Sequence, residues 1–217
     1  MAVKPYIPGD EVLKLEFLIN EQNNGLDSLL KEAFVSFELN KIPTARFTFI
    51  ATNPDIEKKD KIPADDIKEN DEITFNVVTE KEKKLFFKGF IKSAEKAHDG
   101  NTTTVKIECK DKSFQLTVPS AQTETNNQTF DDKLQLFTKK LELGPGMSGK
   151  DWGKEKITHN SNTVPWDFLL GYLDSVGIST AGRNGVFNGV DILAAPPEEK
   201  YLADNAINLF QFSGKAD

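Results

Sequence analysis

The sequence has only one cysteine, two histidines and two methionines among 217 residues. The single cysteine, Cys109, excludes an intrachain disulfide and a cysteine metal cluster. Its place in an alternating segment predicts a small buried side chain rather than a reactive thiol. The histidines, His98 and His159, are far apart, whereas a catalytic zinc needs two or three closely spaced imidazoles. We therefore expect neither a metal nor another cofactor.

Long apolar runs and blocks of basic charge are also missing. No run of about 18 apolar residues could span a bilayer, and residues 1–10 lack the apolar core of a signal peptide. The formal net charge is −7, with acidic and basic residues interleaved. This balance disfavours binding to nucleic acid and to anionic membrane surfaces. We expect a folded chain, made in the cytoplasm, without stable membrane insertion.

Sixteen phenylalanines are present, and from residue 11 to about 118 apolar and polar positions alternate. The apolar sets are Leu13/Leu15/Phe17/Ile19, Val35/Phe37/Leu39, Ala45/Phe47/Phe49/Ala51, Ile73/Phe75/Val77, Leu85/Phe87/Gly89/Ile91, Val105/Ile107/Cys109 and Phe114/Leu116/Val118. Period-two alternation predicts antiparallel strands with one buried face. Turns are expected at Lys41–Thr44 and Asp99–Gly100. Six or seven such strands predict a small barrel or sandwich.

The second half of the chain follows a different pattern. A charged excursion at Asn53–Asp71 and a polar stretch at Ser120–Gln128 interrupt the alternation, and the latter predicts a subdomain boundary. Apolar spacing then predicts a helix from Thr129, its N-cap, to a stop at Gly144. A second helix is expected around Trp166–Val176, with Trp166, Leu169, Leu170, Leu173 and Val176 on its buried face. The dipeptide Asn184–Gly185 predicts a hairpin between Ile178–Arg183 and Val186–Leu193.

No motif predicts an active site. The segment Gly144–Asp151 matches the glycines and lysine of a phosphate-binding loop, but Asp151 replaces the required Ser or Thr, and the segment follows a helix. We interpret it as a helix C-cap and a flexible loop. The pair Asp131/Asp132 fits the first turn of a helix, and Asp65/Asp66 are expected to be exposed. The aromatic residues Trp166, Phe168 and Tyr172 suit core packing better than sugar stacking or peptide docking.

Several segments follow one another in a specific order. They are Phe34–Leu39, Ala45–Phe49, Phe86–Ile91, Thr103–Cys109, Thr129–Leu143, Trp166–Leu170, Gly177–Ile178 and Tyr201–Phe212. Together, over about residues 10–212, they resemble the N-terminal hub portion of VgrG, the type VI secretion spike protein, and its phage late-control D and contractile-tail baseplate hub relatives. The segment Trp166–Leu170 matches the recurrent W-D-F-L-L of that family.

The resemblance implies a β-rich α+β, phage-tail-hub-like fold. It divides the chain into a first antiparallel hub barrel (1–119), an α+β subdomain with two short helices and a hairpin (120–200), and the truncated start of a second barrel (201–217). It implies a structural, non-enzymatic role in a contractile injection apparatus. Such hubs trimerise, dock on the hexameric inner tube, carry the spike, and contact baseplate and effector proteins. They are assembled in the bacterial cytoplasm and delivered outward at the tip.

The resemblance specifies no interface residues, and two other function classes remain open. One is a cell-wall hydrolase associated with a tail hub, which would need two carboxylates facing each other across a cleft. The other is a stand-alone β-barrel binding module with unrelated partners.

Overall fold

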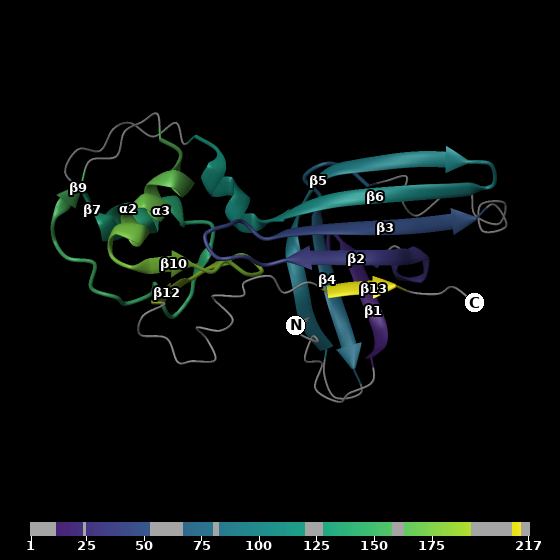
Figure 1. Cartoon of the computed structure of the whole chain (residues 1–217), viewed down its shortest axis with the longest axis horizontal. Helices are drawn as coiled ribbons and strands as arrows, with labels where there is room; N and C mark the ends of the chain where they lie inside the picture. The colour runs from purple at the N-terminus through teal and green to yellow at the C-terminus, as the bar shows by residue number, and fades with distance from the viewer. Residues whose placement is uncertain are drawn as a thin grey trace, which may run out of the picture. The chain divides into compact units, whose positions relative to one another are not determined.

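The alternating segments of the first half form one antiparallel sheet in the computed structural model (Figure 1). The structure describes residues 12–23, 25–52, 67–79, 83–119, 128–157, 163–191 and 210–213. The strands of the sheet are β1 (Val12–Ile19), β2 (Leu30–Ser36), β3 (Thr44–Thr52), β4 (Glu72–Thr79), β5 (Lys83–Asp99), β6 (Thr102–Asp111) and β13 (Phe210–Ser213). Their order is β1-β4-β5-β6-β3-β2-β13, and a short 3-10 helix, η1 (Leu26–Leu29), precedes β2.

Phenylalanines on the buried face of this sheet show that it curls. Phe17 of β1 lies 4.6 Å from Phe47 of β3 and 4.8 Å from Phe75 of β4, between ring centroids. Strands β1 and β3 are separated by β4, β5 and β6 in the sheet order, so only strong curvature brings their rings together. The predicted β-rich, barrel-like fold is confirmed as a curled half-barrel, and no pairing joins β1 to β2 or β13 within the described ranges.

The connections of the sheet confirm one of the two turn predictions, whereas the turn expected at Lys41–Thr44 lies earlier, at residues 39–40. The hairpin at Asp99–Gly100 is confirmed, and Gly100 has a positive φ of 55°. Strand β2, however, ends at Ser36, so Phe37 and Leu39 do not continue it as predicted. The chain turns through Asn40, with a φ of 56°, before β3 begins at Thr44.

Contacts divide the chain into two compact units. We call Met1–Ser36, Pro43–Asp111 and Ile207–Asp217 the sheet unit, and Phe37–Ile42 with Lys112–Ala206 the helical unit. Strand β13 pairs with β2 in the sheet unit. Residues 201–209 lie outside the described ranges, so the start of a second barrel at 201–217 and the boundaries at 119 and 200 stay predictions.

The helical unit contains two α-helices and several short strands. Its elements are η2 (Lys112–Thr117), β7 (Gln128–Thr129), α2 (Phe130–Phe137), β8 (Glu142–Leu143), β9 (Lys156–Ile157), α3 (Pro165–Ser175), β10 (Ile178–Thr180), β11 (Val186–Phe187) and β12 (Gly189–Asp191). Strands β10 and β12 pair antiparallel, β11 and β8 parallel, and β7 and β9 antiparallel. Its core consists of Leu116, Phe130, Leu134, Met147, Trp152, Trp166, Leu169, Leu173, Ile178 and Phe187.

Several predictions for this unit are wrong, and two of them concern whole elements. The segment Phe114–Val118, predicted as a strand, lies mainly in the 3-10 helix η2, which buries Leu116. Val118 follows the helix and is 55% exposed. Helix α2 ends at Phe137 rather than running to Gly144. The Thr138 hydroxyl donates to the carbonyl of Leu134 at 2.7 Å, and the chain then turns to pair β8 with β11.

Helix α3 largely follows its prediction. Pro165 occupies the first helical turn, where its missing N–H costs nothing, and Trp166, Leu169 and Leu173 are buried. Val176 is 49% exposed, contrary to prediction, because it follows the last helical residue and precedes the positive-φ Gly177.

The hairpin after α3 contains the predicted turn. Asn184 and Gly185 have φ values of 55° and 83°, and the backbones of Arg183 and Val186 exchange two hydrogen bonds of 3.0 Å. The observed strands are shorter than predicted, however. The returning chain divides into β11 and β12, which pair with different partners.

An ion pair on the outer face of the sheet makes stability depend on pH. Lys83 pairs with Glu16, which also accepts a hydrogen bond from Asn76 at 2.9 Å. The Lys83 hydrogen bond is the main cause that holds the pKa of Glu16 below its ordinary value of 4.5. The stabilisation is therefore complete above the unfolded-state pKa and is lost as pH falls through the lower folded-state pKa.

We expect Glu16→Gln to lower the free energy of unfolding by about 1 kcal/mol or less at neutral pH. We expect its effect to shrink at acidic pH and to vanish once the wild-type carboxylate is protonated, below its folded-state pKa. Urea unfolding at both pH values measures this difference. Glu108→Gln is the matched control, because the side chain of Glu108 is 58% exposed in its pair with Arg46. An effect of Glu16→Gln that is equal at both pH values would contradict the prediction.

Candidate functional site

The segment Gly144–Asp151 is not a phosphate-binding loop. It follows strand β8, and residues 145–149 form turns rather than the start of a helix. The N–H of Gly146 donates to Asn188 Oδ1 at 2.9 Å, so this amide is already used within the protein. A Cβ on Gly146 would lie 1.8 Å from the carbonyl oxygen of Gly189. The segment is thus packed against β12, and the interpretation as a helix C-cap is wrong.

The histidines and the cysteine form no catalytic group within the described residues. His98 lies near the end of β5, next to the predicted turn, and its Nδ1 is 2.9 Å from Thr103 Oγ1. His159 and Asp65/Asp66 are outside the described residues. Cys109 is 2% exposed, as predicted, and burial raises the pKa of its thiol. No group of three His, Cys, Asp or Glu side chains that could hold a metal occurs in the described part of the chain.

The carboxylates at the start of α2 have the predicted structural role. Thr129 and Asp132 form a capping box, in which the Thr129 N–H donates to Asp132 Oδ2 at 3.0 Å and the Asp132 N–H donates to Thr129 Oγ1 at 3.3 Å. The hydrogen bond from the Thr129 hydroxyl is the main cause that lowers the pKa of Asp132. The side-chain amide of Gln135 donates a hydrogen bond of 2.9 Å to Asp131 Oδ2.

The aromatic cluster on α3 belongs to the core. Tyr172 stacks on Phe130 of α2 with ring centroids 3.8 Å apart, and its hydroxyl donates to the carbonyl of Trp152 at 3.0 Å. Trp166 is 7% exposed and meets Phe187 edge-on. Phe168 is half-buried and packs on Phe130 and Phe137. These three rings therefore pack in the core of the helical unit, as predicted.

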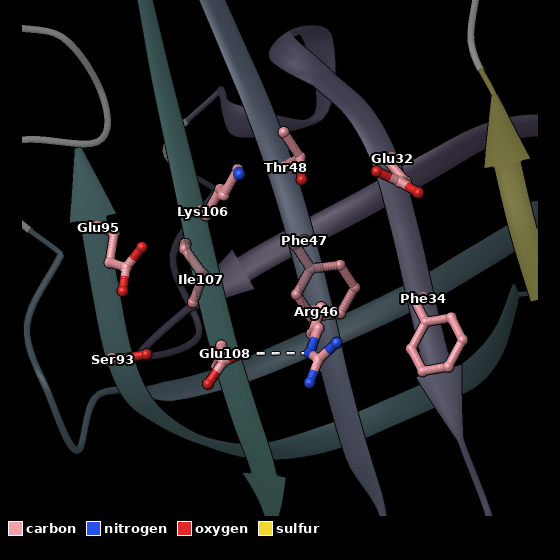
Figure 2. A pocket seen from close by; sticks show the side chains of 10 residues that line it. All are labelled: Glu32, Phe34, Arg46, Phe47, Thr48, Ser93, Glu95, Lys106, Ile107 and Glu108. Atoms are coloured by element: carbon pink, nitrogen blue, oxygen red, sulfur yellow. Dashed lines mark ion pairs between the residues drawn. The ribbon is translucent and has the colours of Figure 1, made fainter. Parts of the chain in front are cut away.

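A hollow of about 460 Å³ on the outer face of the sheet is the candidate interaction surface (Figure 2). Its lining comes from β2, β3, β5 and β6: Glu32, Phe34, Arg46, Phe47, Thr48, Ser93, Glu95, Lys106, Ile107 and Glu108. Most of these side chains stand in two neighbouring rows across the strands. One row is Glu32, Thr48, Lys106 and Glu95, and the other is Phe34, Arg46, Glu108 and Ser93.

The hollow is polar and carries both signs of charge. Figure 2 shows Arg46 and Glu108 facing each other, with Arg46 Nε 3.2 Å from Glu108 Oε1 and both side chains mostly exposed. Phe34 adds one half-buried aromatic ring. Arg46 and Phe34 are of residue types enriched in protein interfaces, whereas the glutamates, Lys106 and Ser93 are of types depleted there, so any partner would be held chiefly by polar contacts. Alternation predicted that Arg46 and Glu108 face outward, but their proximity depends on the strand order, which the sequence does not show.

One family model matches residues 11–193, and its description is the Alg8 N-terminal domain. The chain belongs to this family. No curated protein matches the sequence. Among the described residues, no helix is long and apolar enough to cross a membrane.

Solved structures of tail and secretion proteins share the fold of this family member. The 43 kDa tail protein of prophage MuSo2 from Shewanella oneidensis matches with a TM-score of 0.65 and 14% identity over 82% of this chain. An E. coli component of the type VI secretion system, described as similar to bacteriophage T4 tail proteins gp27 and gp5, matches with a TM-score of 0.54 and 12% identity over 83%. A chain of the Francisella PdpA–VgrG complex matches with a TM-score of 0.52 and 15% identity over 90%.

These likenesses confirm the predicted phage-tail-hub-like fold and the resemblance to VgrG and phage tail proteins. The chain spans 55% of the Shewanella protein, 48% of the E. coli protein and 34% of the Francisella chain. At identities of this level the comparison establishes the shared fold, and function is a separate step.

Proposed function

We propose that this protein is a structural hub component of a contractile injection apparatus. The observation that carries the proposal is the likeness of most of the chain, sheet and helical parts together, to tail and VgrG proteins. We further propose that the protein trimerises, docks on the hexameric tube, carries the spike, and contacts baseplate and effector proteins.

The proposal also assigns a location. The hub assembles in the bacterial cytoplasm and travels outward at the tip of the apparatus. A formal net charge of −7 supports protein contacts over contacts with nucleic acid or anionic lipid.

Binding to the tube protein tests the proposal. We expect the purified chain to co-sediment with hexamers of the tube protein from the same organism, and to shift them to a faster-sedimenting species. A strict monomer that leaves the hexamers unchanged would count against the hub role and favour a stand-alone binding module. Turnover of purified peptidoglycan that one carboxylate substitution abolishes would instead favour the hydrolase.

The hollow is the surface that we propose to test first in this assay. The double variant Arg46→Glu with Glu108→Arg keeps an ion pair across β3 and β6 while reversing the charges that face a partner. We expect it to fold as the wild type and to bind tube hexamers about tenfold more weakly, through lost electrostatic complementarity. The matched control reverses the Glu16–Lys83 pair, which lies outside the hollow. Equal effects of both swaps would contradict the assignment of the hollow.

A further inference from the structure

The loop between β2 and β3 is bound to the helical unit. Residues Phe37–Ile42 belong to that unit by their contacts, although they connect two strands of the sheet. Asn40 adopts a φ of 56°, a left-handed conformation that asparagine and aspartate tolerate better than other residues with a side chain. This conformation lets the side chain and the backbone of Asn40 act on the same neighbour.

That neighbour is Thr180, the last residue of β10. The Thr180 N–H donates to Asn40 Oδ1 at 2.7 Å, and the Asn40 N–H donates to the Thr180 carbonyl at 2.9 Å. The Thr180 hydroxyl lies 3.3 Å from the same Oδ1. On the other side of β10, the strand pairs with β12. One residue of the loop thus replaces a strand at the second edge of β10, using a side-chain oxygen where a strand would use a carbonyl.

The two partners differ in exposure. Thr180 is fully buried at 0% exposed, whereas Asn40 is an exposed residue. A buried N–H that depends on an exposed side chain can lose its partner by a rotation of that side chain, without unfolding of the core.

Two further contacts hold the same loop. The Arg183 guanidinium carbon lies 4.9 Å from the centroid of the Phe37 ring, a cation–π distance. Ile42, near the other end of the loop, packs against the core of the helical unit. The loop is therefore anchored near both ends, and Asn40 makes the contact between them.

We propose that Asn40 is a latch that holds the loop Phe37–Ile42 on β10. Its release opens the loop and frees the edge of β10 together, while α2, α3 and the sheet unit stay folded. The freed edge presents the backbone N–H and C=O of Thr180, the groups through which one strand pairs with another. The latch is a conformational device of the fold and does not depend on the proposed hub role.

Native-state hydrogen exchange on the full chain tests the latch with three variants. Asn40→Gly keeps the left-handed backbone but removes the acceptor, and we expect the Thr180 amide to exchange roughly three- to tenfold faster. In Asn40→Ala, which also strains the backbone, we expect the Thr180 amide to exchange at least as fast as in Asn40→Gly. Asn40→Asp keeps an acceptor oxygen at a residue that tolerates positive φ, and should stay within about twofold of the wild type.

Amides of the two cores are the internal reference. We expect exchange at Phe47 of β3 and Leu169 of α3 to change by less than about twofold in all three variants, because opening is local. An unchanged Thr180 rate in Asn40→Gly would overturn the latch. Equal acceleration at Thr180 and Leu169 would also overturn it, since Asn40 would then contribute only to the global stability of the helical unit.

Discussion

Replacing Phe47 with alanine is expected to lower the free energy of unfolding of the sheet unit by about 3–5 kcal/mol. Phe47 is 1% exposed, and its ring centroid lies 4.6 Å from Phe17, 5.4 Å from Phe75 and 6.4 Å from Phe87. Removing the ring leaves a cavity between strands β1, β3, β4 and β5, and loses three aromatic contacts. The curl of the sheet places these strands around one ring, so the effect should be large.

Urea unfolding followed by far-UV circular dichroism measures this change, because β-strands dominate the sheet unit. Phe34→Ala is the matched control, since it removes the same ring from the outer face of the neighbouring strand β2. Phe34 is half-buried, so we expect a loss of about 1 kcal/mol. A loss for Phe47→Ala no larger than for Phe34→Ala would show that the curled core is not formed as described.

Replacing Gly146 with alanine is expected to lower the free energy of unfolding of the helical unit by about 2–4 kcal/mol. The new Cβ would lie 1.8 Å from the carbonyl oxygen of Gly189, so the backbone of this segment or of β12 must move. That movement would also break the hydrogen bond from the Gly146 N–H to Asn188 Oδ1. Overpacking and the lost hydrogen bond would then both lower the free energy of unfolding.

Tryptophan fluorescence measures this effect selectively, because Trp152 and Trp166 both lie in the helical unit. The control is Gly171→Ala in the middle of α3, where an added Cβ meets nothing within 4 Å. Alanine has the higher helix propensity, so this control should stabilise by about 0.5–1 kcal/mol. If Gly146→Ala left the helical unit as stable as the wild type, the segment Gly144–Asp151 would be flexible, as the sequence had suggested.

Where sequence reasoning succeeded, the signal was local. The strands from β1 to β6 follow period-two alternation, and α3 follows a 3.6-residue apolar spacing that begins at Trp166. The capping box of Thr129 and Asp132 lies within four consecutive residues, and the turn at Asn184–Gly185 uses two residues that tolerate positive φ. Each of these features depends on neighbours a few positions apart.

Where sequence reasoning failed, a distant partner decided the outcome. Leu141 continues the apolar spacing of α2, yet the chain leaves the helix after Phe137 because β8 pairs with β11. The glycines of Gly144–Asp151 suggested flexibility, but Gly146 allows close approach to Gly189. Phe114–Val118 was too short a period-two run to separate a strand from a 3-10 turn.

The amino-acid sequence alone determined the positions of most strands and of both helices, the buried faces of those elements, and the resemblance to tail hubs. Tertiary structure alone decided the strand order β1-β4-β5-β6-β3-β2, the hollow built across it, and the contact of Asn40 with Thr180, 140 positions away. The reason is physical. The periodicity of apolar side chains can be read from the residue types. Strand pairing, in contrast, uses backbone N–H and C=O groups that nearly every residue carries. The packing of the whole chain therefore decides which strands pair.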